Sequence, residues 1–240
     1  RLLCGDVGFG KTEVALRAAF KAITEGKQVA FLCPTTILSL QHTATAMKRF
    51  ENFPIRVEVL NRFVVESKQK EILRELKEGK VDMIIGTHRI LSKDVQFHDL
   101  GLLVIDEEQR FGVEHKEKIK EMKESVDVLS LSATPIPRTL QMSLIGIRSL
   151  SQLETPPSNR MPVQTYVIEK NRALVKEVIE RELARQGQVF YLFNNIQEIY
   201  NVARQIKQDV PEAEIAVAHG KMSRDEIEEV MMQFTDNEVN

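Results

Sequence analysis

The sequence predicts an α/β protein with parallel, doubly wound sheets in two lobes. Short apolar segments alternate with segments of helical periodicity along most of the chain, and this alternation is typical of strand–helix–strand units. The apolar segments are continuous runs, as expected for strands that helices cover on both faces. With 240 residues the chain is long for a single domain, which favours two lobes.

The first lobe is expected over residues 1–150. The apolar run Leu2-Leu3-Cys4 predicts the end of a buried strand, and helical spacing of apolar residues follows as far as Glu25, where Gly26 supplies a stop. Further strands are expected at residues 28–33, 55–60, 82–86, 102–105 and 127–131. Further helices are expected at residues 36–50, 65–76, 113–122 and 137–144.

Residues 151–162 concentrate Pro, Ser and Asn, and we interpret them as a linker. The alternation resumes in a second lobe over residues 163–240. Its strands are expected at residues 163–168, 188–193 and 214–217, and its helices at 173–184, at 196–207 and at the end of the chain up to about residue 234.

Two of these helix starts have the spacing of a capping box, Asn195 with Glu198 and Ser223 with Glu226. Three strands cannot complete a doubly wound lobe, so we expect the second lobe to be truncated. The chain also opens with Arg1 on the first strand, which indicates a piece of a longer protein.

Composition indicates an ordinary globular protein that we expect to be cytoplasmic. No apolar run approaches the length of a membrane span and no signal peptide is visible, so no membrane partner is expected. Cys4 and Cys33 lie in apolar strand-like runs, which favours reduced, buried thiols. The two Cys and five His lack the spacing of a zinc site, and the net charge of −2 does not by itself indicate a nucleic-acid-binding protein.

The stretch GDVGFGKT at 5–12 matches the phosphate-binding pattern G-x-x-x-x-G-K-[ST] between a predicted strand and helix. Its backbone N–H groups and the helix N-terminus suit a phosphate, Lys11 would reach the β- and γ-phosphates, and Thr12 would ligate Mg²⁺. The alternative is a glycine turn that binds nothing. The expected nucleotide-binding residues are Gly5, Asp6, Val7, Gly8, Phe9, Gly10, Lys11, Thr12 and Glu13.

Acidic residues follow the apolar strand that ends at Ile105. At the carboxyl end of such a strand, Asp106 is expected to bind Mg²⁺ and Glu107 to act as the general base, so that Lys11, Asp106 and Glu107 form the catalytic set. A solvated helix start is the alternative. Ser132 and Thr134 follow the strand at 127–131 and could relay the nucleotide state, or could simply cap a helix.

Five segments together resemble superfamily 2 helicases: GDVGFGKT, PTTILSLQH, GTHRIL, VIDEEQRFGV and LSATPIPRT occur in the order of that superfamily's motifs. The combination of DEEQRFGV with SATPIPRT is similar to the group that contains bacterial transcription-repair coupling factors and RecG-type branch-migration helicases. The stretches KDVQFHDLGLLVIDEEQRFGV and VPEAEIAVAHGKM resemble the coupling factors more closely. The resemblance implies two RecA-like lobes, ATP and Mg²⁺ as cofactors, and ATP-driven translocation on double-stranded DNA.

The same resemblance implies roles for further residues. The residues expected to contact the DNA backbone are Pro34, Thr35, Thr36, Gln41, Gly86, Thr87, His88, Arg89, His219 and Lys221. Those expected to couple the nucleotide to DNA are Gln109, Ser132, Thr134 and Arg138. Without the resemblance, Thr35-Thr36 would be interpreted as a helix cap, His88 as a satisfied polar side chain and His219-Gly220 as a turn.

A coupling factor would displace stalled RNA polymerase, and it would bind the polymerase and excision-repair proteins through modules outside this chain. Gln109 stands where many relatives have His, which excludes acid–base chemistry at that position. The family's adenine-recognition segment and its arginine finger are absent from the sequence, so we expect the isolated chain to be nearly inactive. A RecG-type enzyme acting on forks, a non-catalytic nucleotide-binding module and, less favoured, a P-loop kinase remain as alternatives.

Overall fold

The computed structural model describes residues 1–122, 126–133, 149–157 and 163–240. The chain forms two compact units, Arg1–Met161 and Pro162–Asn240, and each is described by itself. Among the described residues, no helix is long and apolar enough to cross a membrane.

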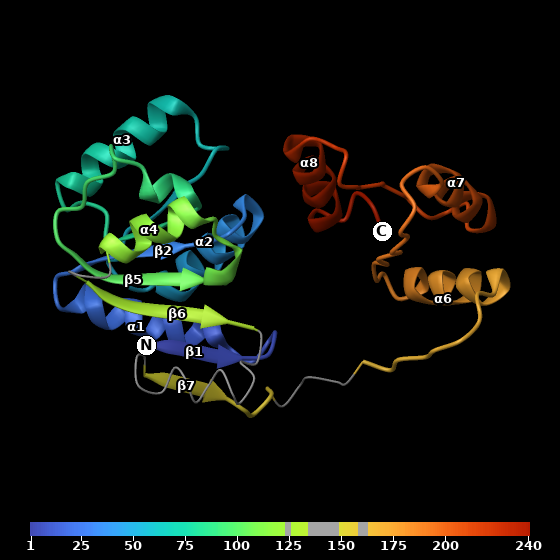
Figure 1. Cartoon of the computed structure of the whole chain (residues 1–240), viewed down its shortest axis with the longest axis horizontal. Helices are drawn as coiled ribbons and strands as arrows, with labels where there is room; N and C mark the ends of the chain where they lie inside the picture. The colour runs from blue at the N-terminus through green and yellow to red at the C-terminus, as the bar shows by residue number, and fades with distance from the viewer. Residues whose placement is uncertain (123–125, 134–148, 158–162) are drawn as a thin grey trace. The chain divides into compact units, whose positions relative to one another are not determined.

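The first unit is built on a seven-stranded sheet in which every neighbouring pair is parallel (Figure 1). The strand order is β3-β4-β2-β5-β6-β1-β7. The strands are β1 Leu2–Gly5, β2 Gln28–Leu32, β3 Val57–Leu60, β4 Met83–Gly86, β5 Leu100–Asp106, β6 Asp127–Ser132 and β7 Leu150–Leu153. The predicted parallel α/β architecture is confirmed.

Helices cover both faces of this sheet because successive strand residues point to opposite sides. Phe31 packs with residues of the first two helices in one core, and its neighbour Leu32 packs with residues of the next two in a second core. The first pair is α1 Lys11–Thr24 and α2 Thr36–Phe50; the second pair is α3 Glu66–Lys77 and α4 Val113–Met122. The sheet is therefore doubly wound. The observed bounds of these helices agree with the sequence prediction to within two residues.

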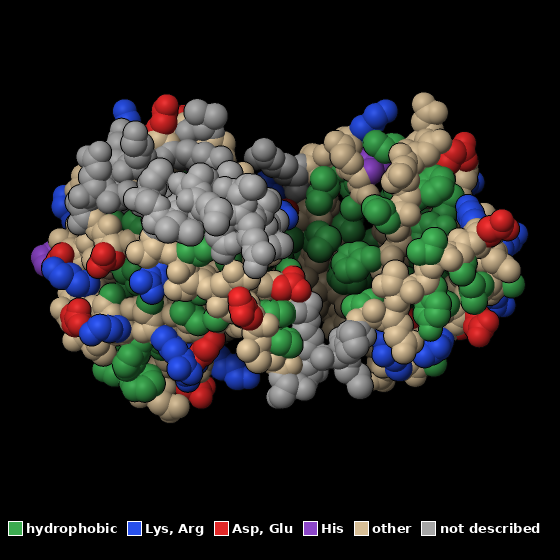
Figure 2. Space-filling view, turned by 60° about the horizontal axis from the view of Figure 1, so that its bottom comes forward, with side chains coloured by type: hydrophobic (Ala, Val, Ile, Leu, Met, Phe, Trp, Pro, Cys, Tyr) green, Lys and Arg blue, Asp and Glu red, His purple; other side chains and the backbone are tan. Residues whose placement is uncertain are grey.

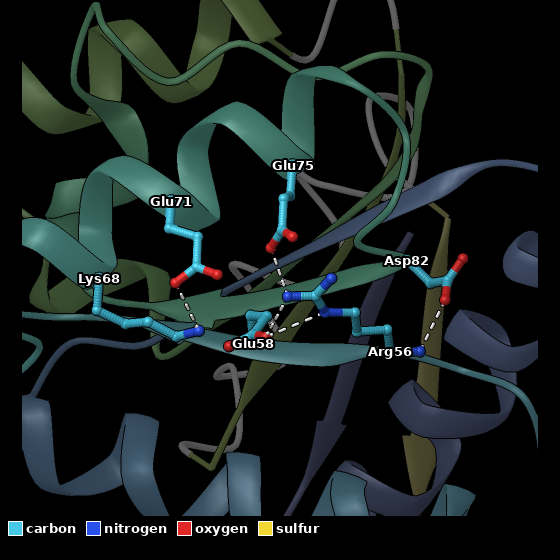
Figure 3. Close-up of polar contacts among 6 residues, drawn as sticks. All are labelled: Arg56, Glu58, Lys68, Glu71, Glu75 and Asp82. Carbon is cyan, nitrogen blue, oxygen red and sulfur yellow. Dashed lines mark hydrogen bonds and ion pairs between the residues drawn. The ribbon is translucent and has the colours of Figure 1, made fainter.

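The edge strand β3 carries a charged cluster (Figure 3). The Arg56 guanidinium donates to Glu58 at 3.0 Å and to Glu75 of α3 at 2.5 Å, and the Arg56 backbone N–H donates to Asp82 at 2.7 Å. Charged side chains at a sheet edge discourage pairing with another strand.

One strand was not expected from the sequence. β7 pairs with β1 at the opposite edge, so the first residues of the predicted linker 151–162 form part of the sheet. The LSQL sequence of β7 lacks a continuous apolar run because an edge strand is only partly covered. The helix predicted at 137–144 lies outside the described residues.

The second unit contains α6 Arg172–Ala184, α7 Ile199–Asp209 and α8 Arg224–Thr235. The segments predicted as strands, 163–168, 188–193 and 214–217, form no strand within the described part of this unit, so these three predictions were wrong for this chain. The apolar pattern of these segments indicates that their side chains favour burial. A β-strand also needs a neighbouring strand that pairs with it in register. Leu192 is 91% exposed, and Figure 2 shows hydrophobic side chains around a hollow on this unit, in the right half of the view.

Helix caps in the second unit agree only in part with the sequence. Ser223 and Glu226 form the predicted capping box of α8. Asn195 caps no helix: its side chain accepts from the Gln197 N–H at 3.0 Å, and α7 begins only at Ile199. Asn forms such local turns as readily as caps, so spacing alone does not distinguish them.

A similar glutamine arrangement occurs in each unit, around the buried Gln28 in the first and the half-buried Gln188 in the second. The Gln28 amide nitrogen donates to the carbonyls of Leu76 and Val81, both at 2.8 Å. The Gln188 amide nitrogen donates to the carbonyls of Phe234 and Val239, at 2.6 and 2.8 Å. In each unit one acceptor lies in the last turn of a helix and the other lies a few residues after it. The helix is α3 in the first unit and α8 in the second, so the second unit repeats a local arrangement of the first.

Candidate functional site

The sheet topology brings three of the sequence motifs to one edge. In the order β5-β6-β1, Cys4 pairs with Ser132 and Leu131 pairs with Asp106, so the carboxyl ends of these strands lie side by side. The phosphate loop leaves β1, the acidic residues leave β5, and the LSATP segment leaves β6. Ligands of open parallel sheets bind at this edge.

The phosphate loop, residues 6–10, has the backbone that its glycines allow. Gly8 and Gly10 have φ of 82° and 85°, which any residue with a Cβ adopts only under strain, and a Cβ at either would meet nothing within 4 Å. Gly10 provides no side-chain cap for α1, so the helix N-terminus stays open. Lys11 Nζ donates to the carbonyls of Gly5 and Asp6 at 2.7 and 3.0 Å, which folds the ammonium group over the base of the loop.

Glu13 is held by arginines. Its carboxylate accepts from Arg49 of α2 at 2.9 and 3.2 Å and from Arg17 at 2.9 Å. These hydrogen bonds lower the pKa of the Glu13 carboxyl, and the bond from Arg49 has the larger effect. The predicted nucleotide-binding residue Glu13 therefore joins α1 to α2 in this structure. Of the other eight, Gly5 ends β1, five form the loop, and Lys11 and Thr12 begin α1.

Asp106 lies buried at the end of β5, with 9% of its surface exposed. Its Oδ2 is 3.1 Å from Nε2 of His42, a residue of α2. The sequence analysis assigned no role to His42, and no local pattern signals it because the contact joins two distant segments. The His42 ring also packs against Phe31, with ring centroids 4.8 Å apart.

Glu107 connects the acidic segment to the LSATP segment. Its backbone is left-handed, with φ of 49° and ψ of 54°, a conformation that costs about 1–3 kcal/mol and is often found at functional sites. Its N–H donates to the Leu131 carbonyl at 3.0 Å, and its carboxylate accepts from the Ala133 N–H at 3.0 Å. The Gln109 amide also donates to this carboxylate.

The remaining coupling residues are only partly described. Ser132 is buried at the end of β6. Two residues earlier in the same strand, Ser130 donates to Glu108 at 2.7 Å, which links the acidic segment to the strand that leads into the LSATP segment. Thr134 and Arg138 lie outside the described residues.

The donors near this edge fit Mg²⁺. Within the described ranges, no group of three or more His, Cys, Asp or Glu side chains could hold a metal ion. Mg²⁺ bound with a nucleotide does not require such a group, because one or two protein oxygens, phosphates and waters complete its shell. The Thr12 hydroxyl and Asp106 Oδ1 are the oxygens available, since the hydrogen bond to His42 uses Oδ2.

The predicted DNA contacts at the start of α2 differ in exposure. Thr35 is the N-cap of the helix and accepts from the Leu38 N–H at 3.3 Å, yet it remains exposed. Gln41 is exposed and Pro34 half-buried, whereas Thr36 is only 6% exposed. Thr35 and Gln41 are thus the side chains of this group that are best placed to meet a phosphate.

The predicted DNA contacts that follow β4 also differ in exposure. A Cβ on Gly86 would lie 2.1 Å from the Leu60 carbonyl oxygen, so the glycine is required by strand packing. Thr87 is 5% exposed, whereas His88 is exposed and its ring centroid lies 5.1 Å from that of His115.

Arg89 is held within the protein. Its Nη1 and Nη2 donate to Asp94 at 2.8 and 2.6 Å, and its Nε donates to Gln69 at 3.1 Å. The same ion pair lowers the pKa of Asp94. A carboxylate thus occupies the face of the guanidinium that would grip a phosphate.

In the second unit, the Tyr200 hydroxyl lies 3.1 Å from Nε2 of His219, and the two rings meet edge to face. The His219 Nδ1 is buried and has no hydrogen-bond partner in the described part of the chain. Lys221 is exposed.

Residues 1–143 match the family model for DEAD/DEAH box helicases. The chain is 59% identical over 238 residues to the transcription-repair-coupling factor of Staphylococcus aureus (strain USA300) and 61% identical to that of Bacillus subtilis (strain 168), covering 99% of this chain and 20% of each relative. It therefore spans about one fifth of the length of these relatives. The structure of RecG bound to a three-way DNA junction matches 98% of this chain and 32% of that one, with a TM-score of 0.81 and 34% identity. These matches confirm the resemblance indicated by the motifs.

Proposed function

Because this chain belongs to the DEAD/DEAH box helicase family, we propose that it is the central motor part of an ATP-dependent double-stranded DNA translocase. The observation that carries the proposal is the meeting of the phosphate loop, Asp106 and Glu107 at adjacent strand ends. A non-catalytic nucleotide-binding module would not require this intact acidic pair.

In the proposed mechanism, the amides of the phosphate loop and Lys11 bind the phosphates of ATP. Lys11 exchanges its two loop carbonyls for phosphate oxygens. Thr12 and Asp106 would hold Mg²⁺, which would supply positive charge to neutralise the phosphates. Glu107 orients the attacking water and accepts its proton.

Coupling to DNA follows from the links between segments. The Glu107 carboxylate contacts the Ala133 N–H, so a change in its position at hydrolysis displaces the LSATP segment. In the first unit, Thr35, Gln41 and His88 are the exposed candidates for contacts to the DNA backbone, and such contacts carry no base specificity.

We propose that the whole protein displaces stalled RNA polymerase and couples transcription to excision repair, through modules outside this chain. The 59–61% identity to two transcription-repair-coupling factors supports this proposal. A RecG-type activity on DNA forks is the second candidate, which the structural match to RecG favours. Displacement of polymerase from a transcription complex, compared with reversal of a model fork by the same full-length protein, distinguishes the two.

The catalytic assignment is tested with Glu107→Gln in the full-length protein. The variant should bind ATP yet lose most turnover, because the amide cannot accept the proton of water. Steady-state phosphate release with duplex DNA and nucleotide affinity are the measurements. Lys11→Ala is the control and should weaken nucleotide binding itself. Near-normal DNA-stimulated hydrolysis by Glu107→Gln would remove Glu107 from the catalytic role.

We propose further that the 240-residue chain alone hydrolyses ATP slowly and is not stimulated by DNA. An arginine finger contributes about 10³–10⁵ in rate in the GTPase template, and the family's arginine motif is absent from these residues. Phosphate release is compared with that of a chain extended through the rest of the second lobe. Robust DNA-stimulated turnover by the 240-residue chain would contradict the two-lobe mechanism.

A further inference from the structure

His42 is placed to act on the metal ligand Asp106. The two residues come from α2 and β5, and 12% and 13% of their side-chain surfaces are exposed, so both side chains are nearly buried. Nε2 lies 3.1 Å from Oδ2. An ionised carboxylate only accepts hydrogen bonds, so Nε2 is the donor. Asp106 has no second hydrogen-bond partner within the described residues, and its orientation at the end of β5 rests on this contact.

The Asp106 charge also acts on Cys33, which is only a weak hydrogen-bond donor. Cys33, at the end of the neighbouring β2, is buried, and burial together with the Asp106 charge raises the pKa of its thiol well above 9.0. The His42 ring packs against Phe31, which restricts the rotation of the ring and therefore the directions that its N–H can take.

We propose that His42 is a positioning residue that turns Oδ1 of Asp106 toward Mg²⁺ and ties the metal site to α2. Partners that orient a ligating carboxylate typically contribute 10–100-fold to metal affinity. Thr35, a candidate DNA contact, caps the same helix about two turns away, so the hydrogen bond joins the metal site to an element that meets DNA. The inference rests on the proposed function, because it assumes that Asp106 binds Mg²⁺ with a nucleotide.

Three substitutions separate a hydrogen bond from packing. His42→Gln keeps an N–H at about the reach of Nε2. His42→Asn has the same amide but is one methylene shorter, so it cannot reach Asp106. His42→Phe keeps the ring that packs on Phe31 and removes the donor. Only the glutamine variant should preserve the orientation of Asp106.

The measurement is binding of a fluorescent ADP analogue to the full-length protein, titrated with Mg²⁺, and repeated in EDTA. For His42→Asn and His42→Phe, the Mg²⁺ concentration for half-maximal enhancement of binding should rise at least about tenfold. His42→Gln should stay within about threefold of the wild type. The affinity for the ADP analogue in EDTA should be the same for the wild type and all three variants. Because binding requires a folded site, an equal affinity also shows that each variant is folded.

The outcomes distinguish this inference from the proposed function. If the wild-type protein binds the nucleotide with no Mg²⁺ dependence, or does not bind it, the proposed function fails. If the wild type responds to Mg²⁺ and His42→Asn responds at the same concentration, the positioning role of His42 is refuted. A loss shared equally by the glutamine and asparagine variants would likewise refute it, because it would assign His42 to packing. Should His42→Phe fail to fold, the glutamine–asparagine pair decides alone.

Discussion

Replacement of Gln28 by leucine should destabilise the first unit severely. Gln28 is 5% exposed, and its amide makes four hydrogen bonds. It donates to the carbonyls of Leu76 and Val81, both at 2.8 Å, and it accepts from the N–H groups of His98 and Asp99 at 2.7 and 3.0 Å. The side chain thus joins the start of β2 to the end of α3 and to the segment before β5.

Leucine has a similar volume, so the substitution opens little cavity but removes the side-chain partner of all four backbone groups. The Leu76 carbonyl keeps its hydrogen bond from the Gly79 N–H at 3.2 Å. A buried polar group that loses its hydrogen bond costs about 1–3 kcal/mol, and the groups nearest the surface regain water. We therefore expect the free energy of unfolding to fall by about 3–5 kcal/mol, taking full loss at two groups and partial loss at the others. Gln28→Glu should be at least as damaging, since a carboxylate cannot donate to two carbonyls.

Urea denaturation of the chain, followed by circular dichroism, measures the change, and hydrogen exchange in peptides from β2 and α3 assigns it to the first unit. Gln41→Leu is the exposed control and should be nearly neutral. Gln188→Leu, which removes only two hydrogen bonds, should cost less and should affect the second unit. A loss below about 1 kcal/mol for Gln28→Leu, at unchanged exchange in α3, would refute the argument.

Two further predictions concern charged pairs. Asp94→Asn should release Arg89 and tighten the binding of duplex DNA to the full-length protein. If Arg89 gains one phosphate contact, the slope of log affinity against log salt concentration should steepen by about 0.9. An unchanged slope would restrict Arg89 to a structural role. The hydrogen bond from Arg56 lowers the pKa of Glu75 below its ordinary value of 4.5 (Figure 3), so the pair contributes stability above that value, and this contribution is lost as the pH falls through the lowered pKa. Acid denaturation should therefore show Glu75→Gln less stable than the wild type at neutral pH, with the difference shrinking below pH 4.5; a pH-independent difference would contradict this.

Much of the first unit could be predicted because its signals are local. Apolar periodicity located α2 and α4 at their observed bounds, and the glycine pattern of residues 5–12 located the loop between strand and helix. The pairing order that brings Asp106 to the phosphate loop is a tertiary property that the sequence did not predict. The general behaviour of parallel sheets predicted only that both lie at the carboxyl ends of strands.

What escaped prediction depends on contacts between distant segments. The exposure of Arg89 could not be inferred from the GTHR motif, because its partners are supplied by α3 and by the segment after the motif. The His42–Asp106 contact spans 64 positions in the sequence, and helical spacing on α2 describes only which face is buried. The strand β7 has too few apolar residues to stand out from the linker.

The repeated glutamine arrangement bears on the second unit, where the sequence and structure differ most. Gln28 begins β2, and its amide donates a hydrogen bond to the last turn of α3. Gln188 begins the segment predicted as a strand at 188–193, and its amide donates a hydrogen bond to the last turn of α8. By this correspondence, residues 188–193 are the counterpart of β2, although they form no ladder here. The shared glutamine arrangement supports the interpretation of the second unit as another RecA-like lobe.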